Sequence, residues 1–308
     1  MEEEIRVILG PTASGKTALA VALAQRTGAE IISADSRQVY RGMDVGTGKD
    51  LAEYGDVPYH LIDIREAGEK YNLALFQEDF SAAVQKIRAR GRQVVVCGGT
   101  GLYIQSLVQG FSDTFVPENA ALRKELEVLP ERELNRLLDD ERRDAARWDA
   151  AQQIAARPST RKRKIRALEI TAFKKANPDV IFPEREKYDF RLFGLDPPPE
   201  IRRARISQRL KQRIQQEGMI AEVEGLIASG VSPEMLEYYG LEYKYITAFL
   251  LGFLRYDEMY ARLETEIHRY AKRQMTFFRS MEKKGIKIEW VPFGLSLEEK
   301  VEYILKCG

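Results

Sequence analysis

The chain has 308 residues, of which 44% are hydrophobic, and its formal net charge is +1, so it can fill one large domain or two but is not a uniformly basic nucleic-acid-binding body. Two widely separated cysteines, Cys97 and Cys307, exclude a disulfide framework and a zinc site, and no apolar run approaches the roughly 20 residues of a membrane helix. We therefore expect a cytoplasmic protein with no membrane segment, in which a local patch of Lys and Arg would hold any polyanion.

The N-terminal stretch predicts a phosphate-binding loop. A strand-length apolar run, residues 5–9, precedes GPTASGKT, which fits G-x-x-x-x-G-K-[ST] at every fixed position, and a helical run follows. Between a strand and a helix, backbone amides from Thr12 to Thr17 can surround phosphate oxygens. Lys16 would add a positive charge, and the Thr17 hydroxyl is placed to bind Mg²⁺. The alternative is a Gly-rich turn without a ligand. The residues expected to bind phosphate here are Gly10, Thr12, Ala13, Ser14, Gly15, Lys16 and Thr17.

An acidic residue follows the second predicted strand, residues 30–33. Asp35 would lie at the carboxyl end of that strand, where ligands bind in open α/β sheets. A helix N-cap or turn residue is the alternative, but the proximity to the phosphate loop favours a functional role. Residues 41–50 then predict an ordered loop. Residues 59–64 predict a strand on which His60 is packed or capping.

A second glycine-rich turn follows the apolar run QVVVC at residues 93–97, which predicts a central parallel strand. The turn Gly98-Gly99-Thr100-Gly101 would bring amides and the Thr100 hydroxyl beside the phosphate loop, unless it is only a tight turn. With a helix expected at 72–90, the order of elements predicts an α/β fold built on a P-loop-type doubly wound parallel sheet. No acidic residue of the Walker B kind ends the strand, which disfavours a nucleoside triphosphatase motor.

The charge pattern changes near residue 113 and predicts three regions. Residues 1–112 would form the first part of the core, 113–160 a small helical insertion, and 161–308 the rest of the core with a helical, basic C-terminal half. The insertion is either a solvated helix pair or a lid. The run from Arg161 to Arg166 predicts a phosphate clamp or a nucleic-acid patch. Further elements are expected at 190–195, 201–216, 219–229, 245–252, 257–284, 286–291 and 296–306, with Tyr270, Phe277 and Phe278 packed in the core.

Six segments, in this order, resemble the tRNA dimethylallyltransferase family, also called tRNA isopentenyltransferases. They are GPTASGKT, SADSRQVYRGMDVGTGK, PYHLIDI, VVVCGGTGLYI, RKRKIRALE and AKRQMTFFR. The resemblance covers nearly the whole chain, and the DSxQxYxGxDxGT run is its most specific part. The short insertion and the segment from Gly240 to Tyr245 depart from the family pattern.

The resemblance implies transfer of the dimethylallyl group from dimethylallyl diphosphate to N6 of the adenosine next to the anticodon, tRNA position 37, with release of pyrophosphate. It implies that Asp35 is the general base, with Thr100 and Lys16 as further catalytic residues, and that Mg²⁺ binds Thr17, water and the diphosphate. It also assigns Arg163 and Arg166 to the diphosphate. The implied tRNA contacts are Asp35, Ser36, Arg37, Gln38, Thr100, Arg123, Lys162, Arg163, Lys164 and Arg273. We expect a monomer that holds the tRNA anticodon stem-loop, mostly through phosphates, with the target base flipped out.

Three alternatives remain at this point. An adenylate isopentenyltransferase would use the same core on a free nucleotide, although the basic C-terminal half favours RNA. A P-loop small-molecule kinase would use ATP. A non-enzymatic RNA-binding protein with a degenerate nucleotide fold is disfavoured by the intact Gly15, Lys16, Thr17 and Asp35.

Overall fold

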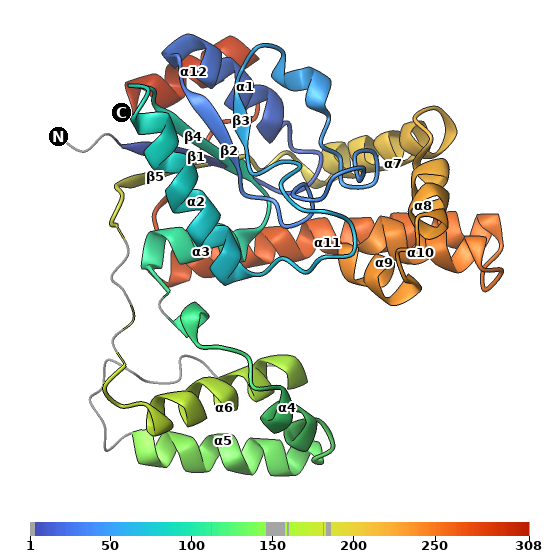
Figure 1. Cartoon of the computed structure of the whole chain (residues 1–308). Helices are drawn as coiled ribbons and strands as arrows, with labels where there is room; N and C mark the ends of the chain where they lie inside the picture. The colour runs from blue at the N-terminus through green and yellow to red at the C-terminus, as the bar shows by residue number, and fades with distance from the viewer. Residues whose placement is uncertain are drawn as a thin grey trace. The chain divides into compact units, whose positions relative to one another are not determined.

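The computed structural model describes residues 4–111, 113–145, 158, 160–180, 182 and 186–307. The chain forms two compact units (Figure 1). We call Met1–Gly110 together with Glu186–Gly308 the α/β unit, and Phe111–Arg185 the helical unit. The predicted insertion ended at residue 160, whereas the helical unit continues to Arg185 and takes in the helix that carries the basic run. Residues 146–157 of the predicted insertion lie outside the described residues.

The α/β unit is built on a parallel sheet of six strands in the order β3-β2-β4-β1-β5-β6. The strands are β1 (Ile5–Leu9), β2 (Glu30–Ser33), β3 (Tyr59–His60), β4 (Val94–Gly98), β5 (Phe190–Gly194) and β6 (Ile288–Trp290). At the centre, Ile8 of β1 pairs with Cys97 of β4 and Phe193 of β5. Strands β2 and β4 are buried along their whole length, as expected for strands of a parallel sheet that is covered on both faces. The predicted α/β fold is confirmed.

Helices cover both faces of this sheet (Figure 1). Helices α1 (Lys16–Thr27) and α12 (Leu297–Lys306) bury Leu19, Leu23 and Ile304 against one face. Helices α2 (Leu73–Arg88), α3 (Gly101–Gln109) and α11 (Tyr256–Lys283) cover the other. There the Phe76 and Tyr103 rings stack with their centroids 4.0 Å apart. The carboxyl ends of β1, β2 and β4 therefore share one edge, and the loops that leave them are neighbours.

Four further α-helices belong to this unit: α7 (Pro199–Gln215), α8 (Met219–Ala228), α9 (Pro233–Tyr239) and α10 (Leu241–Leu250). The sequence predicted one helix at 245–252, but α10 begins earlier and α9 precedes it. Gly240, at φ 139°, separates the two helices in a conformation that other residues rarely adopt. Core packing is confirmed for Phe278, which is fully buried, but Tyr270 is 39% exposed. Among the described residues, no helix is both long and apolar enough to cross a membrane.

The strand predicted at 59–64 is shorter in the structure. Only Tyr59 and His60 pair with β2, because Leu61 and Asp63 have φ angles of 61° and 57°. Side chains other than glycine seldom adopt this left-handed region, so apolar periodicity cannot reveal it. His60 has the packing role expected of it, since its Nε2 lies 2.7 Å from Glu30 Oε2.

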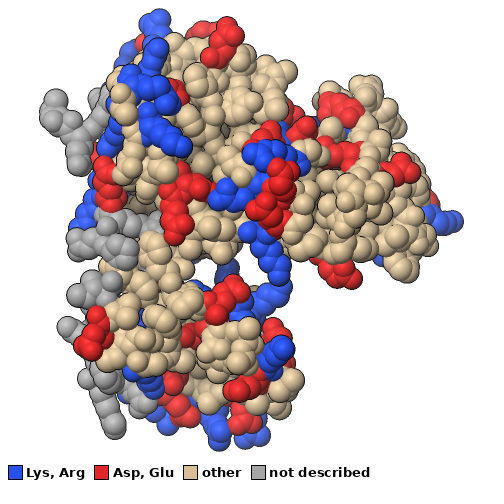
Figure 2. All heavy atoms as spheres, viewed as in Figure 1, with Lys and Arg blue, Asp and Glu red and all other residues tan. Residues whose placement is uncertain are grey.

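The helical unit has its own small core. Helices α4 (Ala120–Glu127), α5 (Glu131–Ala145) and α6 (Arg161–Ala176) bury five aliphatic side chains together: Leu126, Leu134, Leu138, Ile165 and Leu168. Because two of the five come from α6, this helix belongs with the insertion and not with the C-terminal half of the core. On the visible face of this unit, acidic and basic side chains alternate (Figure 2).

Candidate active site

The phosphate-loop motif connects β1 to α1, as the sequence predicted. Ala13 and Gly15 have φ angles of 61° and 86°, in the left-handed region. At Gly10, a Cβ would lie 2.7 Å from Ser14 Oγ and 2.9 Å from the Leu195 carbonyl oxygen, so that only glycine fits. The buried Ser14 hydroxyl has no hydrogen-bond partner among the described residues. A buried polar atom without a partner is costly unless a ligand satisfies it.

Two cations of the loop region have no acidic partner in the part of the chain that the structure describes. Lys16 begins α1, and Arg209 of α7 donates a hydrogen bond to Thr12 Oγ1. Desolvation lowers the pKa of Lys16, against the attraction of Asp35, and lowers the pKa of Arg209 to about 10. Among the described residues, neither side chain forms an ion pair. Desolvated cations that lack a protein counter-ion are typical of a site whose anion arrives with the ligand.

Asp35 lies beside the glycine-rich turn after β4. The Thr100 amide donates to the Ala34 carbonyl (3.2 Å), and Thr100 Oγ1 accepts a hydrogen bond from the Ser36 amide (3.1 Å). The Asp35 carboxylate accepts from the Arg37 amide at 2.9 Å, which fixes its orientation. At Gly98, a Cβ would lie 2.3 Å from the Ala34 carbonyl oxygen. Position 98 therefore requires glycine, because the end of β4 comes close to the residue that follows β2.

A glutamine from the other end of the chain joins these loops. Gln274 of α11 accepts a hydrogen bond from the Thr12 amide through Oε1 (2.9 Å) and donates through Nε2 to the Gly99 carbonyl (2.9 Å). In this structure the Thr12 N–H is used within the protein, and the assignment of Thr12 to the diphosphate stays a prediction. No local pattern in the sequence indicates this role, since Gln274 stands 262 residues from Thr12.

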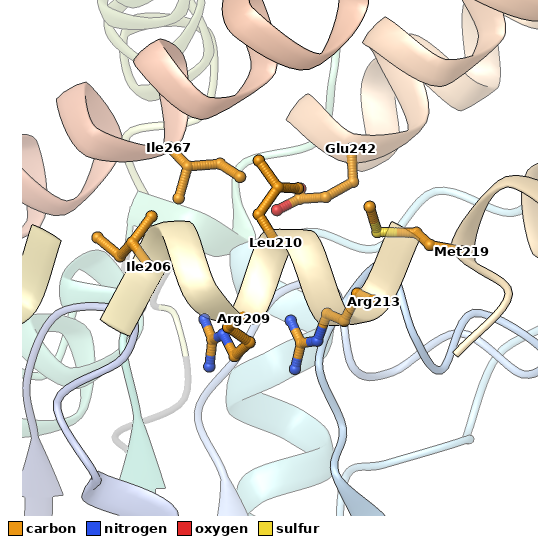
Figure 3. Close-up of a pocket in the computed structure, with 7 residues that line it drawn as sticks. All are labelled: Ile206, Arg209, Leu210, Arg213, Met219, Glu242 and Ile267. Atoms are coloured by element: carbon orange, nitrogen blue, oxygen red, sulfur yellow. The ribbon is translucent and has the colours of Figure 1, made fainter. Parts of the chain in front are cut away.

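Helix α7 contributes a second arginine to this region. Figure 3 shows Arg209 and Arg213 leaving α7 on the same side, whereas Glu242 of α10 is drawn on the other side of α7, next to Leu210. Arg213 donates to both Asp50 carboxylate oxygens, at 2.8 and 3.0 Å, and burial raises the pKa of Glu242. Arg209, Arg213 and Glu242 were not predicted from the sequence as components of the site. The four-residue spacing of the two arginines, which places them on one helix face, was the available signal.

The remaining predicted residues of the α/β unit each have contacts of their own within the protein. The Arg37 guanidinium lies 4.9 Å from the centroid of the Tyr238 ring. Gln38 accepts from Ser33 Oγ and donates to the Gly48 carbonyl. Arg273 on α11 is exposed, with a nitrogen 3.9 Å from Glu266. Their assignment to tRNA stays a prediction.

The five predicted residues of the helical unit have a structural environment of their own. Arg123 and Arg166 both bind the buried Glu169, and Lys164 binds Glu131. Lys162 and Arg163 are exposed on α6. These contacts give a structural reason for several of the cations, while their assignment to diphosphate or RNA stays a prediction.

The residues of the loop region fit a Mg²⁺ ion that binds together with a diphosphate. Among the described residues, no group of three or more His, Cys, Asp or Glu side chains is placed to hold a metal ion. Thr17 stands in the first turn of α1. Mg²⁺ is commonly held by substrate phosphates and water with few protein ligands, so a single hydroxyl suits an ion bound jointly with a diphosphate.

Comparison with known proteins agrees with this geometry. The family described as IPP transferase matches residues 38–281, and the one described as isopentenyl transferase matches residues 3–57. The chain belongs to the IPP transferase family of tRNA dimethylallyltransferases. The resemblance inferred from the motifs is thereby confirmed.

Relatives and solved structures of this family match along almost the entire chain. The chain is 46% identical to tRNA dimethylallyltransferase 2 of Bacteroides fragilis, over 98% of this chain and 96% of that protein. It is 48% identical to tRNA dimethylallyltransferase 1 of Porphyromonas gingivalis, over 97% of each. The crystal structure of a tRNA isopentenylpyrophosphate transferase from Bacillus halodurans superposes with a TM-score of 0.71 at 32% identity, covering 99% of this chain and 95% of that one.

Proposed function

We propose that this family member transfers the dimethylallyl group of dimethylallyl diphosphate to N6 of the adenosine next to the tRNA anticodon, position 37, and releases pyrophosphate. One observation carries the proposal. Lys16 and Arg209 are desolvated and have no acidic partner among the residues that the structure describes, and they share a loop region with Asp35, whose charge acts on Lys16. Such a region can serve a departing anion and an incoming amine together.

On the donor side, the loop stabilises the negative charge that grows on the pyrophosphate as the C–O bond breaks. Lys16 and Arg209 supply positive charge, and the unpartnered Ser14 hydroxyl supplies a donor. Because these groups are fixed before the reaction, they favour the transition state without reorganising. Mg²⁺ at Thr17, when bound with the diphosphate, would neutralise further charge on the leaving group.

On the acceptor side, Asp35 accepts the proton that N6 loses as the C–N bond forms. The lone pair of an adenine amine is delocalised into the ring, so the amine is a weak nucleophile and benefits from a base. The Arg37 amide orients the Asp35 carboxylate, and the Thr100 hydroxyl fixes the turn at Ser36. A base inside a stacked anticodon loop cannot reach this position, so the adenosine must be flipped out.

The wider setting follows from the substrate. The protein would act as a monomer in the cytoplasm and hold the anticodon stem-loop mainly through phosphates, with Arg273 and the exposed cations of α6 as contacts. Relatives named as tRNA enzymes cover almost the full chain, which supports RNA as acceptor over a free nucleotide.

The proposal is tested by incubating unmodified tRNA with labelled dimethylallyl diphosphate or with γ-labelled ATP. We expect label from dimethylallyl diphosphate in the RNA, at position 37 by nucleoside mass analysis. Label from ATP alone would reject the proposal in favour of a kinase. AMP should compete poorly with tRNA as acceptor, and a preference for AMP would indicate an adenylate isopentenyltransferase.

A further inference from the structure

The turn at residues 43–49 contacts Gln38, a predicted tRNA contact, and is held by hydrogen bonds of its own. The Thr47 hydroxyl donates to the Met43 carbonyl at 2.5 Å, and the Lys49 amide donates to the Asp44 carbonyl at 3.1 Å. Lys49 is 1% exposed, and its ammonium group contacts Asp44 and Asp63. The turn is therefore ordered from within, although no helix or strand contains it.

One carboxylate from the C-terminal helices binds the outside of this turn. Glu222 of α8 accepts hydrogen bonds from the Asp44 and Val45 amides at Oε2, both at 2.7 Å. Its Oε1 accepts from the Gly46 amide (3.0 Å) and from the Tyr243 hydroxyl (2.8 Å). Each oxygen thus accepts two hydrogen bonds, which uses the full acceptor capacity of an ionised carboxylate.

The turn packs closely against the Tyr243 side chain at Gly46. A Cβ at Gly46 would lie 2.6 Å from the Tyr243 hydroxyl. Three successive amides that converge on one carboxylate form an anion-binding concavity, which holds the local backbone in one conformation.

The turn in turn orients Gln38. The Gly48 carbonyl accepts a hydrogen bond from Gln38 Nε2 at 3.0 Å, while Gln38 Oε1 accepts from Ser33 Oγ at 2.8 Å. These two contacts assign the amide's donor and acceptor ends and fix the face that Gln38 presents beside Asp35. A path of hydrogen bonds therefore runs from Glu222 through the turn to Gln38.

We infer that Glu222 is a positioning residue for acceptor binding: it holds the turn at 43–49, and through Gly48 it fixes the amide of Gln38 toward the target nucleotide. The inference rests on the proposed function, because Gln38 is a predicted tRNA contact. It extends that function by placing the control of acceptor geometry on α8, 178 residues from the turn that it holds.

The test compares Glu222→Gln with Glu224→Gln in the full chain. Both replace a carboxylate by an amide on α8, but Glu224 is exposed. An amide offers one acceptor oxygen, so Glu222→Gln strips two donors of their partner. We expect the KM for tRNA to rise about tenfold, the size typical for buried donors that lose an ionised acceptor. The Kd for dimethylallyl diphosphate and the kcat at saturating tRNA should change little, and Glu224→Gln should match the wild type.

A double-mutant cycle separates positioning from a general loss of stability. Gln38→Ala should raise the KM for tRNA, and adding Glu222→Gln should raise it no further, because both changes act on the same contact. Independent, multiplying effects would overturn the inference, as would a Glu222→Gln variant with wild-type KM. Should Glu222→Gln also lose dimethylallyl diphosphate binding, Tyr243→Phe removes one donor and keeps the carboxylate, and it must then raise the KM severalfold or the inference fails. A wild-type chain that transfers no dimethylallyl group would instead refute the proposed function.

Discussion

Two groups of cations, one in each unit, differ in how their positive charges are balanced. In the helical unit, Arg123 and Arg166 surround Glu169, and the hydrogen bond to Glu169 raises the pKa of Arg123. In the α/β unit, desolvation lowers the pKa of Lys16 and Arg209, and among the described residues neither has a carboxylate partner. The local density of Lys and Arg is higher in the helical unit's basic run, yet Lys16 and Arg209, which are desolvated and have no acidic partner among the described residues, lie at the phosphate loop.

We infer from this difference that pairing, and not the local density of Lys and Arg, distinguishes a structural cation from one that is available to bind an anionic ligand. Leaving a charge desolvated and unpaired costs free energy, which a protein recovers only when a ligand of opposite charge binds. A cation that already shares a buried carboxylate stabilises the fold and has less capacity for another anion. The following substitutions test this contrast.

The largest loss of activity is expected at the acidic group beside the unpaired cations. Asp35→Ala should reduce dimethylallyl transfer about 10²–10⁴-fold, the range typical for loss of a general base, with tRNA affinity nearly unchanged. Single-turnover rates and tRNA binding measure the two effects. Asp56→Ala, at an exposed position, serves as control. Full turnover of the Asp35 variant would show that another base, or none, is used.

A matched pair of lysines tests the contrast directly. Lys16→Met should lower kcat/KM about 10²–10³-fold, as for loss of a preorganised group facing developing charge, and weaken dimethylallyl diphosphate binding. Lys164→Met, which removes an ion pair with Glu131, should leave dimethylallyl diphosphate binding and the kcat/KM for this donor at saturating tRNA unchanged, and should cost about 1 kcal/mol or less of stability. Equal losses in the two variants would contradict the distinction.

The paired cations are tested through their shared carboxylate. Glu169 is 1% exposed, and the substitution Glu169→Gln should remove the negative charge that pairs with Arg123 and Arg166. Loss of one partner from a buried ion pair costs about 3–5 kcal/mol, seen here as faster amide hydrogen exchange in residues 113–176. Dimethylallyl diphosphate binding should remain. Exchange rates like those of Glu125→Gln, an exposed control on α4, would argue against a structural role.

Acid should affect the helical unit for the same reason. Burial opposes ionisation of Glu169, but hydrogen bonds from Arg123 and Arg166 outweigh it, so its pKa lies below the usual value of 4.5. The stabilisation is therefore fully present above that value and is lost as the pH falls through the lower, folded-state pKa. Hydrogen exchange in α6 between pH 6 and about pH 3 should show protection falling at the acidic end. In Glu169→Gln this pH dependence should be smaller, and an identical profile would refute the assignment.

The smallest effect is expected for an exposed cation of the α/β unit. Arg273→Glu should weaken tRNA binding severalfold. It should also reduce the slope of the logarithm of the binding constant against the logarithm of the salt concentration by about one. Filter binding at several salt concentrations measures both, with Arg26→Glu on α1, paired to Glu302, as control. Unaltered binding and slope would place the RNA elsewhere.

Much of the fold and the centre of the site could be read from the sequence, because their causes are local. Alternating and continuous apolar runs predicted the strands and helices of the sheet. Gly10, Lys16 and Thr17 form a contiguous motif, and Asp35 and Thr100 each directly follow a predicted strand. The carboxyl ends of parallel strands meet at one edge, so placing these residues required only the strand directions. The strand predicted at 59–64 was too long, because the positive φ angles that end it leave no periodic signal. The insertion was predicted to end too early, because the contribution of α6 to the helical core leaves no such signal either.

The tertiary structure alone decided which distant side chains complete the site. Arg209 meets Thr12 across 197 residues, Gln274 meets it across 262, and Glu222 meets the turn at Asp44 across 178. Each of these contacts joins a side chain to a backbone group or hydroxyl whose position depends on the packing of the whole α/β unit. The pairing of each cation is likewise a property of the folded chain, since a carboxylate partner can stand anywhere in the sequence. The residues nearest the chemistry are therefore encoded in short motifs, whereas those that hold them in place are specified only by long-range packing.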